Sequence, residues 1–223
     1  MDNVVGIIYN LTTWIFPLLF TIVLHEVAHG VVAYQFGDYT AKRAGRLTLN
    51  PLDHVDLYGT IIIPAFLLIL QAPLLFGWAK PVPVNFNALN NPKRDMGLVA
   101  LAGPVANFVI AILFAVIGKT LLLILPENIP LSHWIFDNMI NGIQLSLIIG
   151  IFNLFPILPL DGGRIVVSLL PEPYSQKYQE SERYGFMILL GLLFIFPVIG
   201  INPIRWFIET LYPYFIRMVN IFL

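Results

Sequence analysis

Long apolar runs alternate with short polar segments along the whole chain. Five stretches contain no Asp, Glu, Lys or Arg, and each exceeds the roughly 18 residues that suggest a membrane-spanning helix. These stretches are residues 3–25, 59–79, 96–118, 138–160 and 184–204. The pattern predicts an all-α polytopic membrane protein with about five to six transmembrane helices.

The composition supports this interpretation. Of the 223 residues, 58% are hydrophobic and only 11% are charged, whereas ordinary soluble domains carry roughly 25% charged residues. The mean hydropathy is +0.81, so the lipid bilayer is an expected partner. The net charge is −1 and there is no long basic block, so the sequence does not indicate nucleic-acid binding. The absence of cysteine excludes disulfides, thiolate metal sites and cysteine nucleophiles.

The distribution of lysine and arginine predicts which polar segments share a side of the membrane. Segments 37–58, 77–96 and 161–183 each contain three basic residues, and basic residues concentrate on the cytoplasmic side. Segment 126–138 contains acidic residues but no Lys or Arg, so it is expected outside. The chain is therefore expected to be a multi-pass protein of the cell membrane.

The run 59–79 has flanks that are both predicted to be cytoplasmic, so it should enter the membrane and return. Pro64 and Pro73 interrupt it, as expected for a re-entrant region whose free backbone groups are satisfied inside the protein. The alternative is a plain transmembrane helix followed by a second re-entry at "AKPVPVN", residues 79–85.

The remaining elements follow from the same pattern. Helices are expected at about 4–36, 96–120 and 138–160, followed by a C-terminal helical pair, 184–222, broken at Asn202-Pro203. "GRLTLN" (45–50) and "PVPVN" (81–85) have β-branched or alternating character with prolines that suit an edge. They predict short β-strands near the active site, where an exposed edge could pair with an extended peptide.

The stretch "HEVAH", residues 25–29, places three ionisable residues inside an apolar run. His25 and His29 are four apart, so they lie on one helical face and can reach one zinc ion. Glu26 stands where a carboxylate can take a proton from water at the metal, as in helical H-E-x-x-H metalloproteases. The alternative is that both histidines are interior residues bonded to other helices, but charged groups in a membrane mark functional sites by default.

A third zinc ligand must come from elsewhere in the chain, because catalytic zinc usually has three protein ligands. Asp161 is the first charged residue after the run 138–160, at the same predicted depth as the two histidines. It also suits a turn before Gly162-Gly163, so its role stays open on spacing alone. His54 could bind or shield the metal, line a substrate path, or serve a structural role, whereas His133 is expected at the surface.

Taken together, these motifs resemble the site-2 protease family of intramembrane zinc metalloproteases. The resemblance rests on "HEVAHG" at 25–30, "AGPVAN" at 102–107 and "NLFPILPLDGG" at 153–163, and it covers most of a core at 20–165. "GRLTLNPLDHVDLYGT" and "FGWAKPVPVN" are similar to a short prokaryotic-type branch without a PDZ or nucleotide-sensing domain. We therefore expect a single membrane-embedded metalloprotease domain over 1–223.

The resemblance implies roles for particular residues. It implies one Zn²⁺ per chain held by His25, His29 and Asp161, with Glu26 as the catalytic glutamate. Asn153 matches an asparagine associated with holding the substrate. The spacing of Gly103 and Asn107 matches a G-x-x-x-N packing motif, in which Asn107 packs or supports the site.

The function expected from these observations is regulated intramembrane proteolysis. Water activated by zinc, with Glu26 as general base, would hydrolyse peptide bonds of transmembrane protein or peptide substrates, at an active site toward the cytoplasmic side. The alternatives are a membrane metal-ion transporter, which would not need Glu26, and a catalytically inactive membrane scaffold. The sequence leaves the substrate and the oligomeric state open.

Overall fold

The computed structural model describes residues 2–70, 77–126 and 129–223, and these residues are helical or irregular, without a strand. Four helical stretches are long and apolar enough to cross a membrane: Val4–Gln35, Pro92–Ile124, Pro130–Asn153 and Glu182–Ile199. The all-α multi-pass prediction is confirmed, with fewer such stretches than the five to six expected. One reason is that α9 (Pro203–Asn220) carries three charged residues and is strongly amphipathic.

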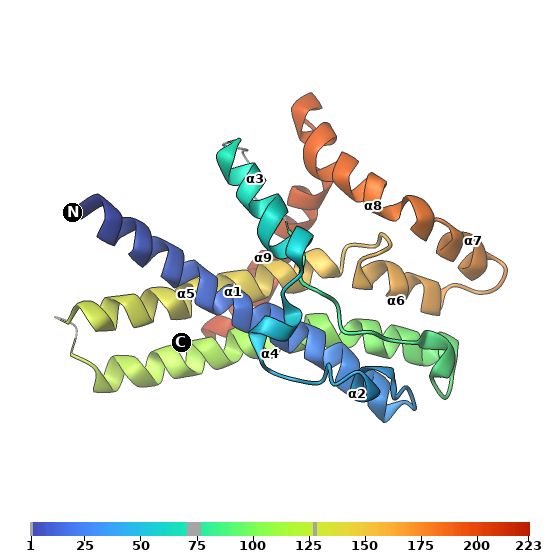
Figure 1. Ribbon diagram of the computed structural model, residues 1–223, viewed down its shortest axis with the longest axis horizontal. Helices are drawn as coiled ribbons and strands as arrows, with labels where there is room; N and C mark the ends of the chain where they lie inside the picture. Colours follow the sequence, from blue (N-terminus) through green and yellow to red (C-terminus); the bar gives the residue numbers. More distant parts are fainter. Residues whose placement is uncertain (1, 71–76, 127–128) are drawn as a thin grey trace.

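Three long helices form the centre of the molecule: α1 (Asp2–Gln35), α4 (Pro92–Ile124) and α5 (Pro130–Asn153). In Figure 1, α4 and α5 run side by side and α1 crosses them. Close packing depends on small residues, because a Cβ on Gly142 would lie within 3 Å of the Phe114 ring. The main core cluster consists of Ile110, Ala111, Phe114, Ala115, Ile143, Leu147 and Val219.

Polar side chains connect α1 to α5 along the membrane. Thr21 Oγ1 and Ser146 Oγ, both fully buried, lie 2.9 Å apart, and Trp134 Nε1 donates to Thr12 Oγ1 at 2.9 Å. Near the N-terminus, the Tyr9 hydroxyl donates to Asp137 at 2.6 Å. Because lipid is as apolar as leucine, such bonds and close packing hold the two helices together.

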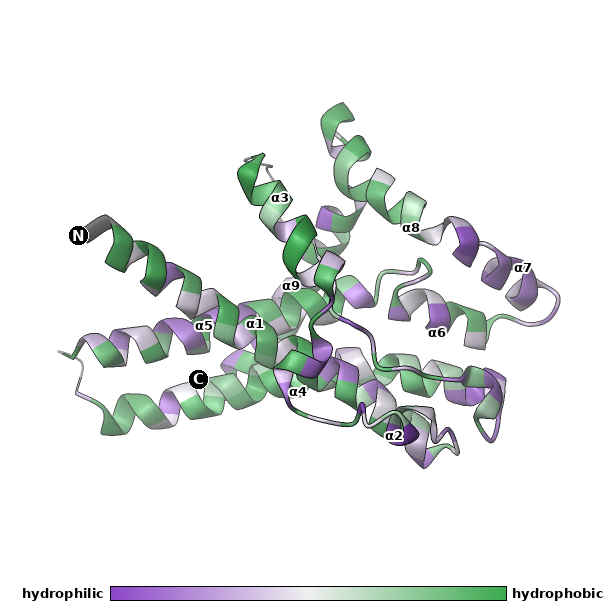
Figure 2. Cartoon of the chain, viewed as in Figure 1, coloured by the Kyte–Doolittle hydropathy of each residue, from purple (hydrophilic) through white to green (hydrophobic). Residues whose placement is uncertain are grey.

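The polar segments gather at one end of this bundle. α2 (Thr40–Arg43), α6 (Asp161–Leu169), α7 (Tyr174–Glu180) and the turn η3 (Phe86–Ala88) lie at the end opposite the connection from α4 to α5 (Figure 1). Figure 2 shows α2 and α7 as largely hydrophilic, whereas the long helices are mostly hydrophobic. Parts of all three basic segments therefore lie at one end of the bundle. That this end is the cytoplasmic side of the membrane stays a prediction.

The described ends of the run 59–79 lie next to each other. The run begins in the π-helix η2 (Leu57–Ile62) and the helix α3 (Ile63–Ile69), and residues 71–76 lie outside the described part of the chain. On the return, Trp78 N–H donates to the Gly59 carbonyl at 3.1 Å, and Thr60 Oγ1 donates to the Trp78 carbonyl at 2.9 Å. The two ends of the run therefore adjoin, and re-entry of the run into the membrane stays a prediction.

The two predicted β-strands do not form. Residues 46–50 and 77–85 lie near each other, since Arg46 Nη2 donates to the Lys80 carbonyl at 3.0 Å, but no ladder joins them. The prediction was wrong: Pro81 and Pro83 have no N–H to give to a ladder, and the amide between them donates to Glu26 instead of to a neighbouring strand. Four amides of residues 77–85 donate to other parts of the chain instead.

Two predicted helix boundaries are changed by prolines and one is confirmed. The third long helix was expected over 138–160, but α5 starts at Pro130 and ends at Asn153, since Pro156 and Pro159 cannot continue it. The break at Asn202-Pro203 is confirmed. The helical stretch formed by α8 (Glu182–Leu190), η4 (Gly191–Ile195) and η5 (Phe196–Ile199) ends before Gly200, and α9 begins at Pro203.

Candidate metal centre

Helix α1 presents His25 and His29 on the face turned toward α4 and α6. The helical period places the two rings one turn apart, and their Nε2 atoms lie 3.1 Å from each other. His25 is 6% exposed and His29 is half-buried, so both imidazoles lie inside the protein. Two aromatic nitrogens thus point at one location.

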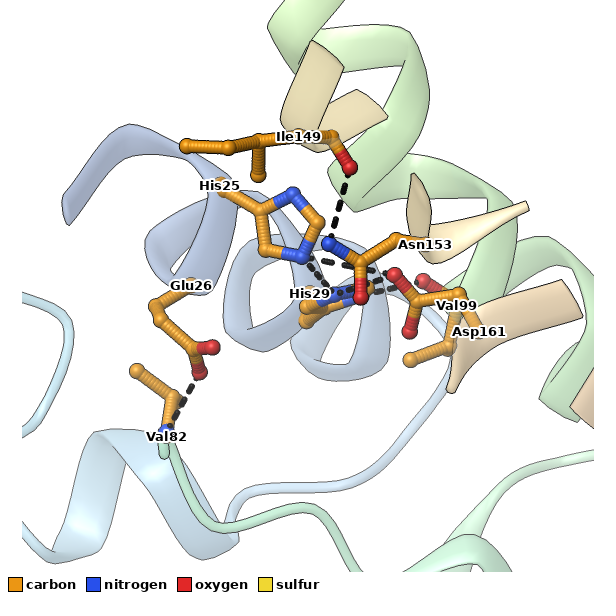
Figure 3. A network of polar contacts seen from close by, with 8 residues as sticks. All are labelled: His25, Glu26, His29, Val82, Val99, Ile149, Asn153 and Asp161. Atoms are coloured by element: carbon orange, nitrogen blue, oxygen red, sulfur yellow. Dashed lines mark hydrogen bonds and ion pairs between the residues drawn. The ribbon is translucent and has the colours of Figure 1, made fainter. Parts of the chain in front are cut away.

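Asp161 completes this group from the first position of α6. Its Oδ2 lies 3.3 Å from His25 Nε2 and 3.4 Å from His29 Nε2 (Figure 3). The following Gly162 and Gly163 make this approach possible, because a Cβ on either would overlap main-chain atoms of residues 154–158. The Asp-Gly-Gly sequence therefore sets α6 tightly against the loop that follows α5.

The donor atoms fit a zinc ion. His29 Nδ1 lies 2.7 Å from the Val99 carbonyl, which can only accept, so Nδ1 carries the proton and Nε2 presents a lone pair. Asp161 Oδ2 is buried and receives no hydrogen bond from the described residues. Ligands of a tetrahedral zinc at about 2.0–2.1 Å would lie about 3.3 Å apart, close to the three separations above.

Gly103 of α4 lies directly against the two imidazoles. A Cβ at this position would lie within 3 Å of ring atoms of both His25 and His29. The glycine therefore lets α4 approach α1 at the depth of the three candidate ligand atoms. The "AGPVAN" stretch thus has a physical explanation in the packing of the centre.

Glu26 lies on the neighbouring face of α1, half-buried beside the three candidate ligand atoms. Its Oε2 accepts a hydrogen bond of 2.9 Å from the main-chain N–H of Val82 (Figure 3). Oε1 has no hydrogen-bond donor among the described residues. The carboxylate is therefore held on one oxygen and free on the other.

Asn153, the last residue of α5, lies next to His25 and Asp161 (Figure 3). Its Nδ2 donates to the Ile149 carbonyl at 3.0 Å, which fixes the amide and leaves Oδ1 available. Asn107 lies deeper, fully buried against Gly150, and neither of its amide atoms has a partner among the described residues. Of the two asparagines, Asn153 is thus the one that adjoins the three candidate ligand atoms.

His54 is not part of the three-residue group. It is 3% exposed, its Nε2 donates to the Thr48 carbonyl at 2.9 Å, and its own carbonyl accepts from Lys80 N–H at 2.9 Å. These bonds join the loop after α2 to residues 77–85. His133 is exposed, as expected.

Asp38, just after α1, is a buried carboxylate that the motifs did not single out. It is 1% exposed, and it accepts from Asn85 N–H at 2.6 Å, from Thr40 N–H at 2.9 Å and from the Thr40 hydroxyl. Burial by itself would raise the pKa of Asp38, but these bonds and the nearby Arg43 hold that pKa below its ordinary value. The carboxylate therefore stays charged and ties residues 77–85 to α1.

Sequence reasoning also missed the contributions of Val82 and Val99. Both act through main-chain atoms, an N–H toward Glu26 and a carbonyl toward His29. The identity of a residue does not reveal a contact made by its main chain. The prolines on both sides of Val82 are a partial signal, because they leave Val82 as the one main-chain N–H donor of residues 81–83.

The sequence of this chain is similar to those of several known proteins. The chain matches the sequence model of peptidase family M50 over residues 13–129 and 131–196. It is 41% identical over 189 residues to "Putative zinc metalloprotease YwhC" of Bacillus subtilis, covering 82% of this chain and 80% of that protein. It is 30% identical to a protein of Mycolicibacterium smegmatis named Rip2, covering 88% of this chain and 70% of the relative.

A more distant relative is "Zinc metalloprotease MJ0392" of Methanocaldococcus jannaschii. It is 26% identical over 223 residues, which cover 94% of this chain and 50% of the relative. No solved structure gives a significant match.

Proposed function

Since this chain belongs to peptidase family M50, the site-2 protease family, we propose that it cleaves membrane-spanning substrates with Glu26 as general base. The family membership makes the chain a zinc metalloendopeptidase, and its long apolar helices make it a multi-pass membrane protein. The proposal covers the substrate, the roles of the site residues and the side of the membrane that the site faces. It also includes a single protease domain over 1–223.

One observation carries the proposal above all others: three lone-pair atoms from two helices meet at one buried location. His25 Nε2, His29 Nε2 and Asp161 Oδ2 lie within 3.4 Å of each other, a separation that suits one zinc ion. We propose these three as its ligands, one ion per chain. Zinc held there supplies a Lewis acid that polarises a carbonyl and lowers the pKa of water to about 7.

Glu26 handles the protons of the reaction. Its carboxylate takes a proton from the attacking water, whose oxygen forms a bond to the scissile carbonyl carbon. The same carboxyl then gives that proton to the leaving amine as the C–N bond breaks. Glu26 follows His25 directly on α1 and so lies next to the proposed ligand atoms. Because it carries the proton from the water to the amine, no second acid is needed to protonate the leaving group.

The substrate must lose helical structure before it can react. A transmembrane helix uses its carbonyls in i to i−4 hydrogen bonds, so the scissile bond becomes accessible only where the helix unwinds. Asn153 Oδ1, held beside the ligand atoms, is positioned to accept an N–H of the unwound stretch. Water and the cleaved ends would pass on the side of the basic segments, which we propose is the cytoplasm.

The test is cleavage of model single-pass membrane proteins by the wild-type chain and by Glu26→Gln, with zinc content measured on both purified proteins. Loss of cleavage in Glu26→Gln with zinc retained is the expected result. Equal cleavage by both chains would overturn the role of Glu26. Zinc binding with metal transport and no cleavage by either chain would favour a transporter, and zinc binding with neither activity would favour an inactive scaffold.

A further inference from the structure

Residues 77–85, which we name the strap, cross the face of the molecule beside Glu26 without forming a strand. Four of the strap's amides donate to four different segments of the chain. Trp78 N–H bonds to the Gly59 carbonyl at 3.1 Å, and Lys80 N–H bonds to the His54 carbonyl at 2.9 Å. Val82 N–H bonds to Glu26 Oε2 at 2.9 Å, and Asn85 N–H bonds to Asp38 Oδ2 at 2.6 Å.

The bond from Val82 to Glu26 lies in a tightly packed place. Val82 is 5% exposed, and a Cβ on Gly30 would lie 2.7 Å from Val82 Cγ1 and 2.5 Å from Leu47 Cδ2. Gly30 thus gives the strap room to rest on α1 one turn after Glu26. Because the side chain of Val82 is wedged there, its N–H has little freedom to turn away from the carboxylate.

The sequence of the strap makes this N–H unique. Pro81 and Pro83 have no amide hydrogen, and their rings limit the backbone to an extended form near φ of about −65°. The stretch 81–83 therefore has one donor, and that donor is used by Glu26. Asp38 fixes the far end of the strap through Asn85, so the donor is held from both sides.

We propose that the strap is a positioning element for Glu26, and that Val82 is its acting residue. The Val82 N–H fixes Oε2 so that Oε1 faces the reacting water and carries the proton in transfer. This assignment rests on the proposed role of Glu26 as the base. It adds Val82 as a residue that acts through Glu26 and touches neither metal nor substrate.

The assignment also restricts how a substrate can bind. From Lys80 to Pro83, each residue either donates its N–H inside the protein or has none, so this stretch has no N–H for an added substrate strand. The strap thus serves the base, and substrate pairing through donated amides must use another segment.

The first test measures hydrogen exchange and does not depend on activity. A peptide covering 81–83 contains a single exchangeable main-chain amide, that of Val82, so its exchange reports the bond to Glu26 directly. In the purified full chain we expect exchange at Val82 to become about tenfold faster or more in Glu26→Ala. Glu26→Gln keeps a side-chain oxygen that can accept, so it should keep most of the protection. Equal Val82 exchange in wild type and Glu26→Ala would overturn the proposal, whether or not the chain cleaves any substrate.

The second test removes the donor instead of the acceptor. Val82→Pro deletes the N–H, Val82→Ala keeps it while losing side-chain packing, and Val84→Pro places the same ring two residues further on. We expect Val82→Pro to lower kcat at least tenfold with KM and zinc content kept within about twofold. Val82→Ala should lose much less, and Val84→Pro should stay within about twofold of wild type.

Two results of the second test would overturn the proposal. A loss in Val82→Ala as large as that in Val82→Pro would assign the effect to packing and overturn the proposal, as would unchanged kcat in Val82→Pro. If Val82→Pro also loses its zinc, the exchange experiment alone decides. If the wild-type chain cleaves nothing, the proposed function fails while the bond to Glu26 is still measured by exchange.

Discussion

Gly103→Ala is the substitution that most directly tests the assembly of the metal centre. The added Cβ would lie within 3 Å of ring atoms of His25 and His29, far inside van der Waals contact. These rings cannot simply move aside, since His29 Nδ1 is bonded to the Val99 carbonyl and both Nε2 atoms face Asp161. Helices α1 and α4 must therefore separate, or the ligand atoms must lose their alignment.

The expected magnitude has two parts. Overpacking a buried site typically costs about 1–3 kcal/mol, partly masked by the gain of up to about 1 kcal/mol that alanine brings to a helix. Displacing the imidazoles should also weaken zinc, by about 10–100-fold if the loss matches that of other groups that orient ligands. Gly118→Ala is the matched control on the same helix, because its Cβ would lie 3.3 Å from Met139 Cβ, a contact that a small shift relieves.

The assay is competition for zinc against a chelator in detergent, together with the Tm of each variant with and without zinc. Gly103→Ala should show weaker zinc binding and a smaller rise in Tm on adding zinc, whereas Gly118→Ala should match wild type in both. Zinc affinity within twofold of wild type in Gly103→Ala would refute the contact between α4 and the imidazoles as the basis of the centre.

Three further predictions follow from other contacts. Asp38→Asn should lower stability at neutral pH by about 1–3 kcal/mol, since hydrogen bonds to a charged group are lost. Because the pKa of Asp38 lies below its ordinary 3.8 in the folded chain, its contribution is present above about that pH and declines as pH falls through the folded value. Thermal unfolding between pH 2 and 7 should therefore be less pH-dependent in Asp38→Asn, and an unchanged profile would contradict this. Asn153→Ala should keep zinc content and raise KM several-fold in a cleavage assay, and a loss of zinc instead would assign Asn153 to the metal centre. Removing zinc with a chelator should lower Tm, by the equivalent of about 4.1 kcal/mol if the free ion was at 1,000 times its Kd, and Asp161→Ala should abolish that dependence.

Local periodicity explains why part of the site could be predicted from the sequence. His25, Glu26 and His29 lie within five positions of one helix, so the 3.6-residue period alone sets their relation. Asp161 is more than 130 residues away, and only its place after an apolar run suggested a shared depth. The geometry of this pairing depends on Gly162 and Gly163, whose close contacts with residues 154–158 could not be read from the pattern.

The rest of the prediction failed or was incomplete where tertiary contacts override local preference. Residues 81–85 have a strand-like composition, yet the amides of Val82 and Asn85 bond to Glu26 and Asp38 instead of to a neighbouring strand. The run 138–160 was judged by the absence of charge, which does not register that Pro156 ends a helix. The use of Val82 and Val99 could not be predicted, since any residue type except proline offers an N–H and every residue offers a carbonyl.

The length of α1 bears on how far the candidate metal centre lies from water. The apolar stretch Val4–Gln35 has 32 residues, about 48 Å of helix, against a hydrocarbon core of about 30 Å. Such hydrophobic mismatch is relieved by tilting the helix, by letting its end emerge, or by thinning the bilayer around it. His25 is ten residues from Gln35, about 15 Å along the axis, and tilt, thinning or emergence at that end shortens its distance to the interface. The thickness of the surrounding bilayer therefore influences how far water must travel from the interface to the metal centre. The lipid composition of the host membrane thus becomes a factor in how the enzyme works.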